Sequence, residues 1–188
     1  VRYFKNHNIL KILSFDMISI SVFTFFIIWM YQPRLQELGL PLIYFGLIHA
    51  AVTGIQIPFT HYFGVLENFF RSKKNYLLGS AIIAGMAFIG LGLTTFIPLT
   101  IVLILIVAGF GLSRPALFQS YMNKHIESHN RAAVLSSISM VNRFVKGLAY
   151  PLVGLLVEWS LSYAFIVIGI LILGFAVMSR VQEAHLVD

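Results

Sequence analysis

Six apolar runs, each about as long as a membrane is thick, dominate this sequence. A helix needs about 20 residues to cross the roughly 30 Å hydrocarbon layer of a bilayer. Only helices and closed barrels satisfy backbone polar groups in lipid, and these runs lack the alternation of barrel strands. The sequence therefore predicts an all-α, polytopic membrane protein with six transmembrane helices. We place the spans at about 12–31, 42–66, 76–96, 99–118, 132–157 and 161–179.

The composition excludes the soluble classes of protein. Hydrophobic residues make up 59% of the 188 residues, charged residues make up 11%, and the mean hydropathy is +0.87. A soluble domain carries about 25% charged residues, so this chain lacks the polar surface of a cytosolic enzyme. Cysteine is absent, which excludes a disulfide scaffold and a thiolate metal site.

No catalytic or cofactor-binding motif stands out. The sequence lacks the G-x-S-x-G, H-E-x-x-H and P-loop patterns, so we expect no enzyme activity, no cofactor and no metal. His125 and His129 have an i, i+4 spacing that can bind a metal ion. Because no third ligand lies nearby, we interpret them as solvated loop residues.

The basic residues lie mostly in the short gaps between the apolar runs, which indicates membrane orientation rather than nucleic-acid binding. The net charge is +6 and the pI is about 9.7. When the gaps are assigned to alternate sides, ten Lys and Arg residues fall on one side and only Arg34 on the other. The positive-inside rule then places both termini in the cytoplasm. The ten are Arg2, Lys5, Lys11, Arg71, Lys73, Lys74, Arg114, Lys124, Arg131 and Arg180.

Turn-forming residues mark the connections between spans. Gln32-Pro33 and Gly39-Leu40-Pro41 punctuate the first connection, and Pro98 separates the third span from the fourth. Glycines inside the third and fourth spans are expected to let neighbouring helices approach closely and rock. These glycines are Gly85, Gly90, Gly92, Gly109 and Gly111.

The loop between the second and third spans carries a degenerate motif. It reads Gly64-Val65-Leu66-Glu67-Asn68-Phe69-Phe70-Arg71-Ser72-Lys73-Lys74. This resembles the cytoplasmic loop motif of the major facilitator superfamily, Gly-x-Leu-small-Asp-Arg-x-Gly-Arg-Arg/Lys. Gly64, Leu66 and Lys73 match, and Asn68 stands where aspartate is usual. Departures from the motif are Glu67, Phe69, Arg71 and Ser72.

Later segments resemble the same family over nearly the whole chain. They resemble its tenth and eleventh helices with their joining loop, and the first loop resembles its seventh-to-eighth connection. The resemblance implies the C-terminal six-helix half of a twelve-helix transporter, so residues 1–188 form one bundle whose partner is an N-terminal six-helix half. Val1 in place of methionine leads us to expect a segment of a longer chain. The segments are Gly109–Pro115, Asn130-Arg131-Ala132, Leu135-Ser136 and Pro151-Leu152-Val153-Gly154.

Polar side chains form a stripe on the second span. His49, Thr53, Gln56 and Thr60 follow at i, i+4, i+7 and i+11, which is one face of a helix. Two interpretations stay open: a cavity wall that contacts substrate, or interhelical hydrogen bonds worth under about 1 kcal/mol each. His49 either carries a proton, since imidazole titrates near pH ~6.5, or is a neutral hydrogen-bonded residue.

The fifth span carries a second stripe that includes two cations. Arg143 lies twelve residues after Arg131, about 18 Å along a helix. Two cations at that depth are costly unless they are paired or hydrated, so they attract an anionic substrate group or a carboxylate of the missing half. Alternatively, this helix begins later and both lie at the interface. The predicted cavity residues of the stripe are Ser139, Asn142, Arg143, Lys146 and Tyr150, and Ser136 precedes them.

Asp16 and Arg114 are candidates for coupling and gating. Asp16 is the acidic residue inside the first span; away from water it can exchange protons near neutral pH, or it is a solvated end group one turn past Lys11. Its partner is Arg143, Lys146 or Arg114, and the sequence does not choose among them. Arg114 either latches a cytoplasmic gate by pairing with Glu67 or anchors the span; Asn68 of the loop motif is the second gating residue.

The resemblance implies a secondary active transporter that works by alternating access. We expect a multi-pass protein of the plasma membrane, proton-coupled, that exports drug-like or metabolite substrates. Its partners are then the lipid bilayer, a small-molecule substrate, protons and the N-terminal half, with no nucleic acid. The alternative is a six-helix membrane scaffold or oligomerising subunit without its own transport cycle.

Overall fold

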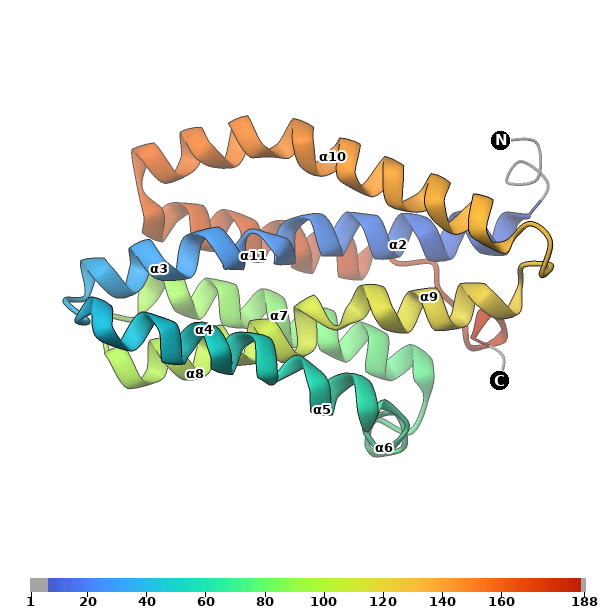
Figure 1. Cartoon of the computed structure of the whole chain (residues 1–188), viewed down its shortest axis with the longest axis horizontal. Coiled ribbons are helices and arrows are strands. Elements are labelled where there is room, and N and C mark those ends of the chain that lie inside the picture. The colour runs from blue at the N-terminus through green and yellow to red at the C-terminus, as the bar shows by residue number, and fades with distance from the viewer. Residues whose placement is uncertain (1–6, 187–188) are drawn as a thin grey trace.

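A computed structural model describes residues 7–186 and shows a bundle of membrane-length helices (Figure 1). Within these residues there are helices and turns but no strand. Five helical segments are long and apolar enough to cross a membrane, and a sixth apolar helix has 17 residues. The expected all-α membrane bundle is therefore confirmed. Val1, Arg2 and Lys5, which the sequence analysis used, lie outside the described residues.

The chain passes along the bundle six times, and several passes are broken into two or three helices. The first pass is α2 (Asn8–Phe25) and α3 (Ile27–Glu37); the second is η1 (Leu42–Tyr44), α4 (Phe45–Gly54) and α5 (Gln56–His61). A short α6 (Phe63–Phe69) leads to α7 (Lys73–Leu93). The fourth pass is α8 (Ile97–Ile106), the π-helical η2 (Val107–Leu112) and α9 (Arg114–Lys124). Then follow α10 (Arg131–Trp159), α11 (Leu161–Val177) and η3 (Glu183–His185).

The first helix is longer than the turn residues predicted. Pro33 lies inside α3, so the expected break at Gln32-Pro33 is wrong and the turn begins only after Glu37. Gly39 has a positive φ of 82°, and the amide of Leu40 donates to the carbonyl of Leu35 at 3.0 Å. This is the Schellman ending, in which the left-handed residue is usually glycine. Proline only removes one amide donor, which a membrane helix tolerates.

The other helix ends also differ from the predicted spans by a few residues. The second pass stops at His61 rather than at residue 66, because the chain turns there and begins α6. The third pass begins at Lys73 rather than at residue 76, since the hydroxyl of Ser72 accepts a hydrogen bond from the amide of Asn75 at 3.1 Å and caps the helix. Ser, Thr, Asp and Asn are the preferred residues at that position.

Glycines hold α7 and α11 at close range. A Cβ atom on Gly169 would lie 2.6 Å from the carbonyl oxygen of Gly85, and one on Gly92 would lie 2.6 Å from the carbonyl oxygen of Ser162. Side chains at these positions would therefore force the two backbones apart. The expected close approach is confirmed at Gly85, Gly90, Gly92, Gly109 and Gly111, each of which faces an atom of another element within 3.0 Å of an added Cβ.

The second and fifth passes are much less covered than the others. Only 6% of the most apolar window of Arg131–Trp159 is buried, and 11% of that of Leu42–His61, against 50% to 56% in the other three long segments. In Figure 1, α10 lies along one flank of the bundle and α4 with α5 along the other, with α2, α7 and α11 between them. The two helices that carry the predicted polar stripes are thus the two most open ones.

The two ends of the bundle differ in charge. The first residues of α2, the α6–α7 connection, the end of α9 and the start of α10 all lie at one end, which we call the basic end (Figure 1). The end that holds Gly39 and Ser160 is the opposite end.

Candidate functional site

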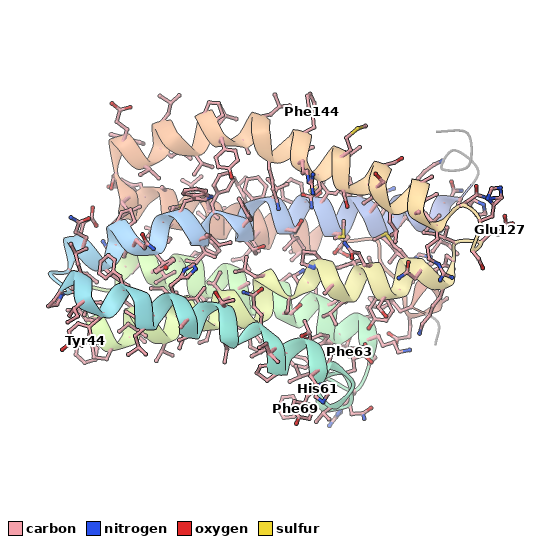
Figure 2. The ribbon with its side chains drawn as sticks, in the orientation of Figure 1. Tyr44, His61, Phe63, Phe69, Glu127 and Phe144 are labelled. Atoms are coloured by element: carbon pink, nitrogen blue, oxygen red, sulfur yellow. The ribbon has the colours of Figure 1, made fainter. Side chains whose placement is uncertain are left out.

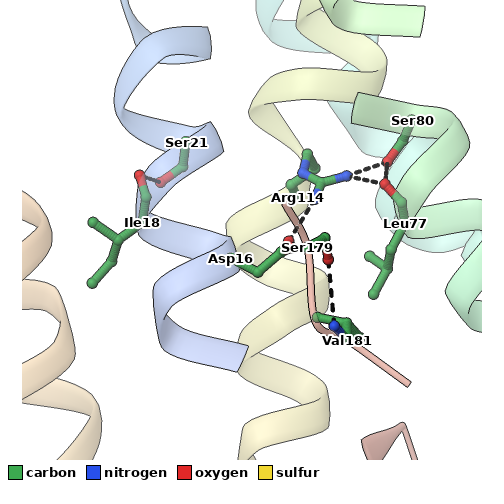
Figure 3. A network of polar contacts seen from close by, with 8 residues as sticks. All are labelled: Asp16, Ile18, Ser21, Leu77, Ser80, Arg114, Ser179 and Val181. Carbon is green, nitrogen blue, oxygen red and sulfur yellow. Dashed lines mark hydrogen bonds and ion pairs between the residues drawn. The ribbon is translucent and has the colours of Figure 1, made fainter. Parts of the chain in front are cut away.

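A buried ion pair joins the first and fourth passes near the basic end. The guanidinium Nη2 of Arg114 lies 3.0 Å from Oδ1 of Asp16, and the two side chains are 1% and 4% exposed (Figure 3). The other terminal nitrogen, Nη1, donates to the carbonyl of Leu77 and to Oγ of Ser80, the latter at 2.5 Å. Of the three partners left open for Asp16, the structure shows Arg114. Its burial also shows that Asp16 is not a solvated end group.

The pairing with Glu67, one of the two interpretations left open for Arg114, is not the one that the structure shows. Arg114 bonds Asp16, Leu77 and Ser80, whereas the carboxylate of Glu67 accepts a hydrogen bond from the hydroxyl of Tyr121. Tyr121 follows Arg114 by seven residues on α9, about 10 Å along the helix axis. Arg114 and Tyr121 thus bond different partners, although both lie on α9. Asn68, the other predicted gating residue, is exposed on α6 and is not hydrogen-bonded by Arg114.

A π-helical segment immediately precedes Arg114. Val107–Leu112 forms this segment, and the hydroxyl of Ser113 donates to the carbonyl of Gly109. A π-helical turn holds more residues than an α-helical turn, so it changes the face on which the following side chains lie, and such turns are frequent at functional sites. In this chain, the side chain of Arg114 at the start of α9 lies on the face that packs against α2 and α7.

The chain that follows α11 is bound across the basic end. A cavity of about 270 Å³ lies there, lined among others by Asp16, Arg114 and Lys74, and by Ser179 and Val181 of the tail. Figure 3 shows this tail passing beside the ion pair.

A glutamate of the tail fixes it to the start of α7. The carboxylate of Glu183 accepts from the amides of Lys73 at 3.0 Å and Lys74 at 2.9 Å, where the helix dipole favours a negative charge. His125 bonds the carbonyl oxygen of His185 at 2.8 Å. His125 is therefore half-buried against the tail, and its interpretation as a solvated loop residue is wrong.

The stripe on the second pass bonds mostly to its own helix. Thr53 donates to the carbonyl of His49 at 3.0 Å, Gln56 to that of Val52 at 3.1 Å, and Thr60 to that of Gln56 at 2.9 Å. His49, Thr53 and Thr60 are exposed, and Gln56 is half-buried. These bonds satisfy the donor groups of Thr53, Gln56 and Thr60. The exposed hydroxyl oxygens of the two threonines can still accept hydrogen bonds from further partners.

His49 is the member of the stripe that contacts another pass. Its Nδ1 lies 2.9 Å from the hydroxyl of Tyr31, which also accepts from the amide nitrogen of Gln32 at 3.0 Å. Tyr31 is fully buried, so this hydrogen bond holds α4 against the end of the first pass.

The two stripes meet at one pocket. A cavity of about 230 Å³ is lined by Gln56 of α5, Lys146 of α10, and Ser21 and Thr24 of α2 among others. The ammonium nitrogen of Lys146 lies 4.1 Å from the centre of the Phe25 ring, a cation–π contact. Residues from three separate passes therefore place a cation and several hydroxyl and amide groups around one small space.

An aromatic pocket follows toward the opposite end. It measures about 410 Å³ and is lined by Phe26, Trp29 and Tyr150 with aliphatic residues. Tyr150 contacts the rings of Phe25 and Phe26 edge-on, with centroids 6.3 and 5.3 Å apart. Tyr150 thus belongs to the same face of the bundle as Lys146, as its spacing predicted.

A family model described as the Major Facilitator Superfamily matches residues 14–185. The chain belongs to the Major Facilitator Superfamily. Membership identifies it as a multi-pass membrane transporter for small-molecule substrates and confirms the resemblance drawn from the loop motif. Comparison with curated proteins and with solved structures gave no significant match.

The remaining predicted residues of this major facilitator chain lie on α10 outside the two cavities. Arg143 is exposed and Ser139 is half-buried. Asn142 has a buried Oδ1 atom with no hydrogen-bond partner. Figure 2 shows Phe144 pointing away from the bundle, and it is 66% exposed. The outer face of α10 is therefore apolar, while its polar residues lie on other faces.

Arg34 has a structural role in this major facilitator protein, although it was not among the predicted site residues. It is 5% exposed and donates to the carbonyl of Thr94 at 2.7 Å, to Oγ of Ser162 at 3.1 Å and to Glu37 at 3.1 Å. Arg34 thus ties the first pass to the end of α7 and the start of α11. The sequence did contain a signal for such a role, because Arg34 is the one cation assigned to the side that is poor in basic residues.

Proposed function

We propose that this chain is one half of a secondary active transporter that moves small organic solutes by alternating access. The observation that carries the proposal is the pocket shared by Gln56 and Lys146. These residues belong to the two least covered passes, and polar groups at membrane depth are tolerated where they line a cavity. Substrate sites in this kind of fold lie near the bilayer midplane between two halves.

The second half of the proposed site comes from an N-terminal six-helix bundle of the same transporter. Large apolar side chains on the open passes, such as Leu47, Ile57 and Leu155, are 71%, 68% and 64% exposed. Exposed apolar surface alone fits lipid equally well, but the exposed imidazole of His49 does not. A partner bundle over the face between α4 and α10 gives both kinds of side chain a suitable environment.

We infer that transport is coupled to protons and runs outward, with Asp16 and His49 as the coupling residues. The carboxylate of Asp16 is held by Arg114 in a buried setting, so a proton that neutralises it removes the counter-charge of Arg114. The guanidinium then has to find another partner, which links protonation to movement of α9 against α2. His49 offers a second site, because its ring bonds Tyr31 of a neighbouring pass.

The basic end is the proposed cytoplasmic end, in the plasma membrane. Lys73, Lys74, Lys124 and Arg131 all lie at the ends of helices on this side of the bundle. The positive-inside rule relates this distribution to the cytoplasmic side. The loop motif around Asn68 lies at the same end.

The test is solute flux in proteoliposomes that hold the full-length protein under an imposed proton gradient. We expect gradient-driven accumulation that Asp16→Asn lowers at least tenfold and His49→Ala lowers several-fold. Glu158→Gln is the matched control, because it makes the same carboxylate-to-amide change on an exposed residue of α10. Undiminished accumulation in both variants contradicts the coupling assignment, and no flux in the wild-type protein contradicts transport itself.

A further inference from the structure

Two cations on α10 lack a counter-ion in the described chain. Arg143 and Lys146 lie near the middle of the 29-residue helix Arg131–Trp159. Within residues 7–186, no carboxylate lies within ion-pair distance of either side chain. The two are one turn apart on the same helix, so each also repels the other.

The contacts that Lys146 does have are too weak to explain its position. Its ammonium nitrogen rests 4.1 Å from the centre of the Phe25 ring. Such a contact contributes about 0.5–2 kcal/mol, whereas removing an unpaired ion from water costs several kcal/mol. A position of this kind is stable when an anion occupies the neighbouring space.

We propose that the transported solute is an organic anion with an aromatic or apolar body. Its anionic group binds Lys146 in the polar pocket, and its body lies against Phe26, Trp29 and Tyr150. Arg143, one turn away on α10 and exposed, adds positive charge on the same helix. This proposal rests on the transport function proposed above and narrows the class of substrate.

The polar pocket suits the anionic end of such a solute. Lys146 lines it together with Gln56, Ser21 and Thr24, so hydroxyl and amide donors surround the cation. The amide of Gln56 and the hydroxyl of Thr24 already donate to backbone carbonyls of Val52 and Ser21. Lys146 is therefore the charged donor of this pocket, and its ammonium group has no acceptor among residues 7–186.

The aromatic pocket suits the body of the solute. Phe25 lines the polar pocket and Phe26 the aromatic one, and the ring of Tyr150 contacts both edge-on. The two cavities therefore flank one pair of adjacent phenylalanines. Ring faces of this kind stack on aromatic groups and exclude water from them.

The same geometry disfavours the other charge classes of solute. A cationic drug would meet Arg143 and Lys146 and be repelled. A neutral solute would fill the pocket and leave Lys146 dehydrated without an anion, which costs binding energy. Only an anion pairs the charges that the fold has placed there.

The experiment compares two probes that differ in charge and share one shape. Equilibrium binding of radiolabelled naphthoate and of its neutral amide, naphthamide, is measured on the full-length protein in lipid nanodiscs. We expect the wild-type protein to bind naphthoate at least tenfold more tightly than naphthamide. Equal affinities overturn the proposal, because a carboxylate from the other half then neutralises the cations.

Variants that change the charge of Lys146 test whether this residue causes the preference for naphthoate over naphthamide. Lys146→Gln is expected to weaken naphthoate binding about tenfold while naphthamide binding changes less than twofold, and Lys146→Arg is expected to restore the preference. Arg131→Gln is the matched control, since it removes a cation at the basic end of the same helix. Loss of both probes to the same extent in Lys146→Gln, with the fold intact by size exclusion, overturns the assignment of Lys146.

Flux measurements separate this proposal from the transport function. If the wild-type protein prefers naphthoate but moves no solute across proteoliposomes, the transport function fails and the anion site stands. If it moves neutral solutes and shows no preference between the two probes, transport stands and the anionic substrate class is overturned.

Discussion

Arg114 and Asp16, 98 residues apart in the sequence, form an ion pair whose side chains are 1% and 4% exposed. Ser80 and the carbonyl of Leu77 bind the remaining face of the guanidinium. The pair therefore connects α2, α7 and α9 at one point near the basic end.

The first prediction concerns the stability of this pair. Arg114→Gln alone leaves a buried carboxylate without its counter-charge and is expected to destabilise the protein by about 3–5 kcal/mol. The double variant Asp16→Leu with Arg114→Met is expected to recover much of the loss, because no buried charge remains. Thermal unfolding in detergent measures both. A single variant as stable as the wild-type protein contradicts the structural role of the pair.

The second prediction concerns Arg34 at the opposite end. Arg34→Gln removes the contacts with Thr94 and Ser162 and is expected to lower the unfolding free energy by about 1–3 kcal/mol. Glu37→Gln is the control, because the side chain of Glu37 is 51% exposed and such pairs contribute about 0–1 kcal/mol. The Tm values of the two variants are compared with that of the wild-type protein. An equal loss of stability in both would show that the exposed pair with Glu37, and not the buried contacts with Thr94 and Ser162, stabilises the protein.

The third prediction concerns the tail. The chain has no cysteine, so a single introduced thiol at the buried Val181 reports whether the tail leaves its place. Adding Glu183→Gln to Val181→Cys removes the charge that binds the amides of Lys73 and Lys74, and labelling by a water-soluble maleimide is expected to speed up about tenfold. Adding Glu158→Gln instead is expected to leave the rate unchanged. Equal rates in all three proteins contradict docking through Glu183.

The fourth prediction concerns the contact between α7 and α11. Gly169→Ala places a Cβ atom 2.6 Å from the carbonyl oxygen of Gly85, and it is expected to cost about 1–3 kcal/mol through overpacking. Gly147→Ala makes the same change on α10, where nothing lies within 4 Å, and is expected to be neutral or stabilising because alanine favours helices. Folding yield and Tm test this, and a stable Gly169→Ala variant would contradict the close approach.

The helices could be predicted from sequence because hydrophobicity and length are local properties. About 20 consecutive apolar residues are enough to specify a membrane-spanning helix. The predicted all-α bundle rests on that property of each span. The ends were less predictable. Pro33 and Gly39 both look like turn residues, yet only Gly39 occupies a backbone conformation that requires one.

Pairing between passes could not be predicted from the sequence. Asp16 had three candidate partners, and Glu67 had looked suitable for Arg114. The choice depends on how far each helix is rotated and shifted against its neighbours, and the π-helical segment before Arg114 changes that rotation. Hydrogen bonds such as that between Tyr31 and His49 depend on the same rotation.

By itself, the sequence determined that the chain forms membrane-spanning helices, which end carries the basic residues, and which helix faces are polar. Only the tertiary structure decided that Asp16 binds Arg114, that Gln56 and Lys146 share a pocket, and that the tail binds at the basic end. The physical reason is that the two kinds of interaction act over different distances along the chain. Transfer into lipid is set by each residue and its near neighbours along the chain, whereas a hydrogen bond or ion pair forms only within about 3–4 Å and so requires the positions of two helices at once.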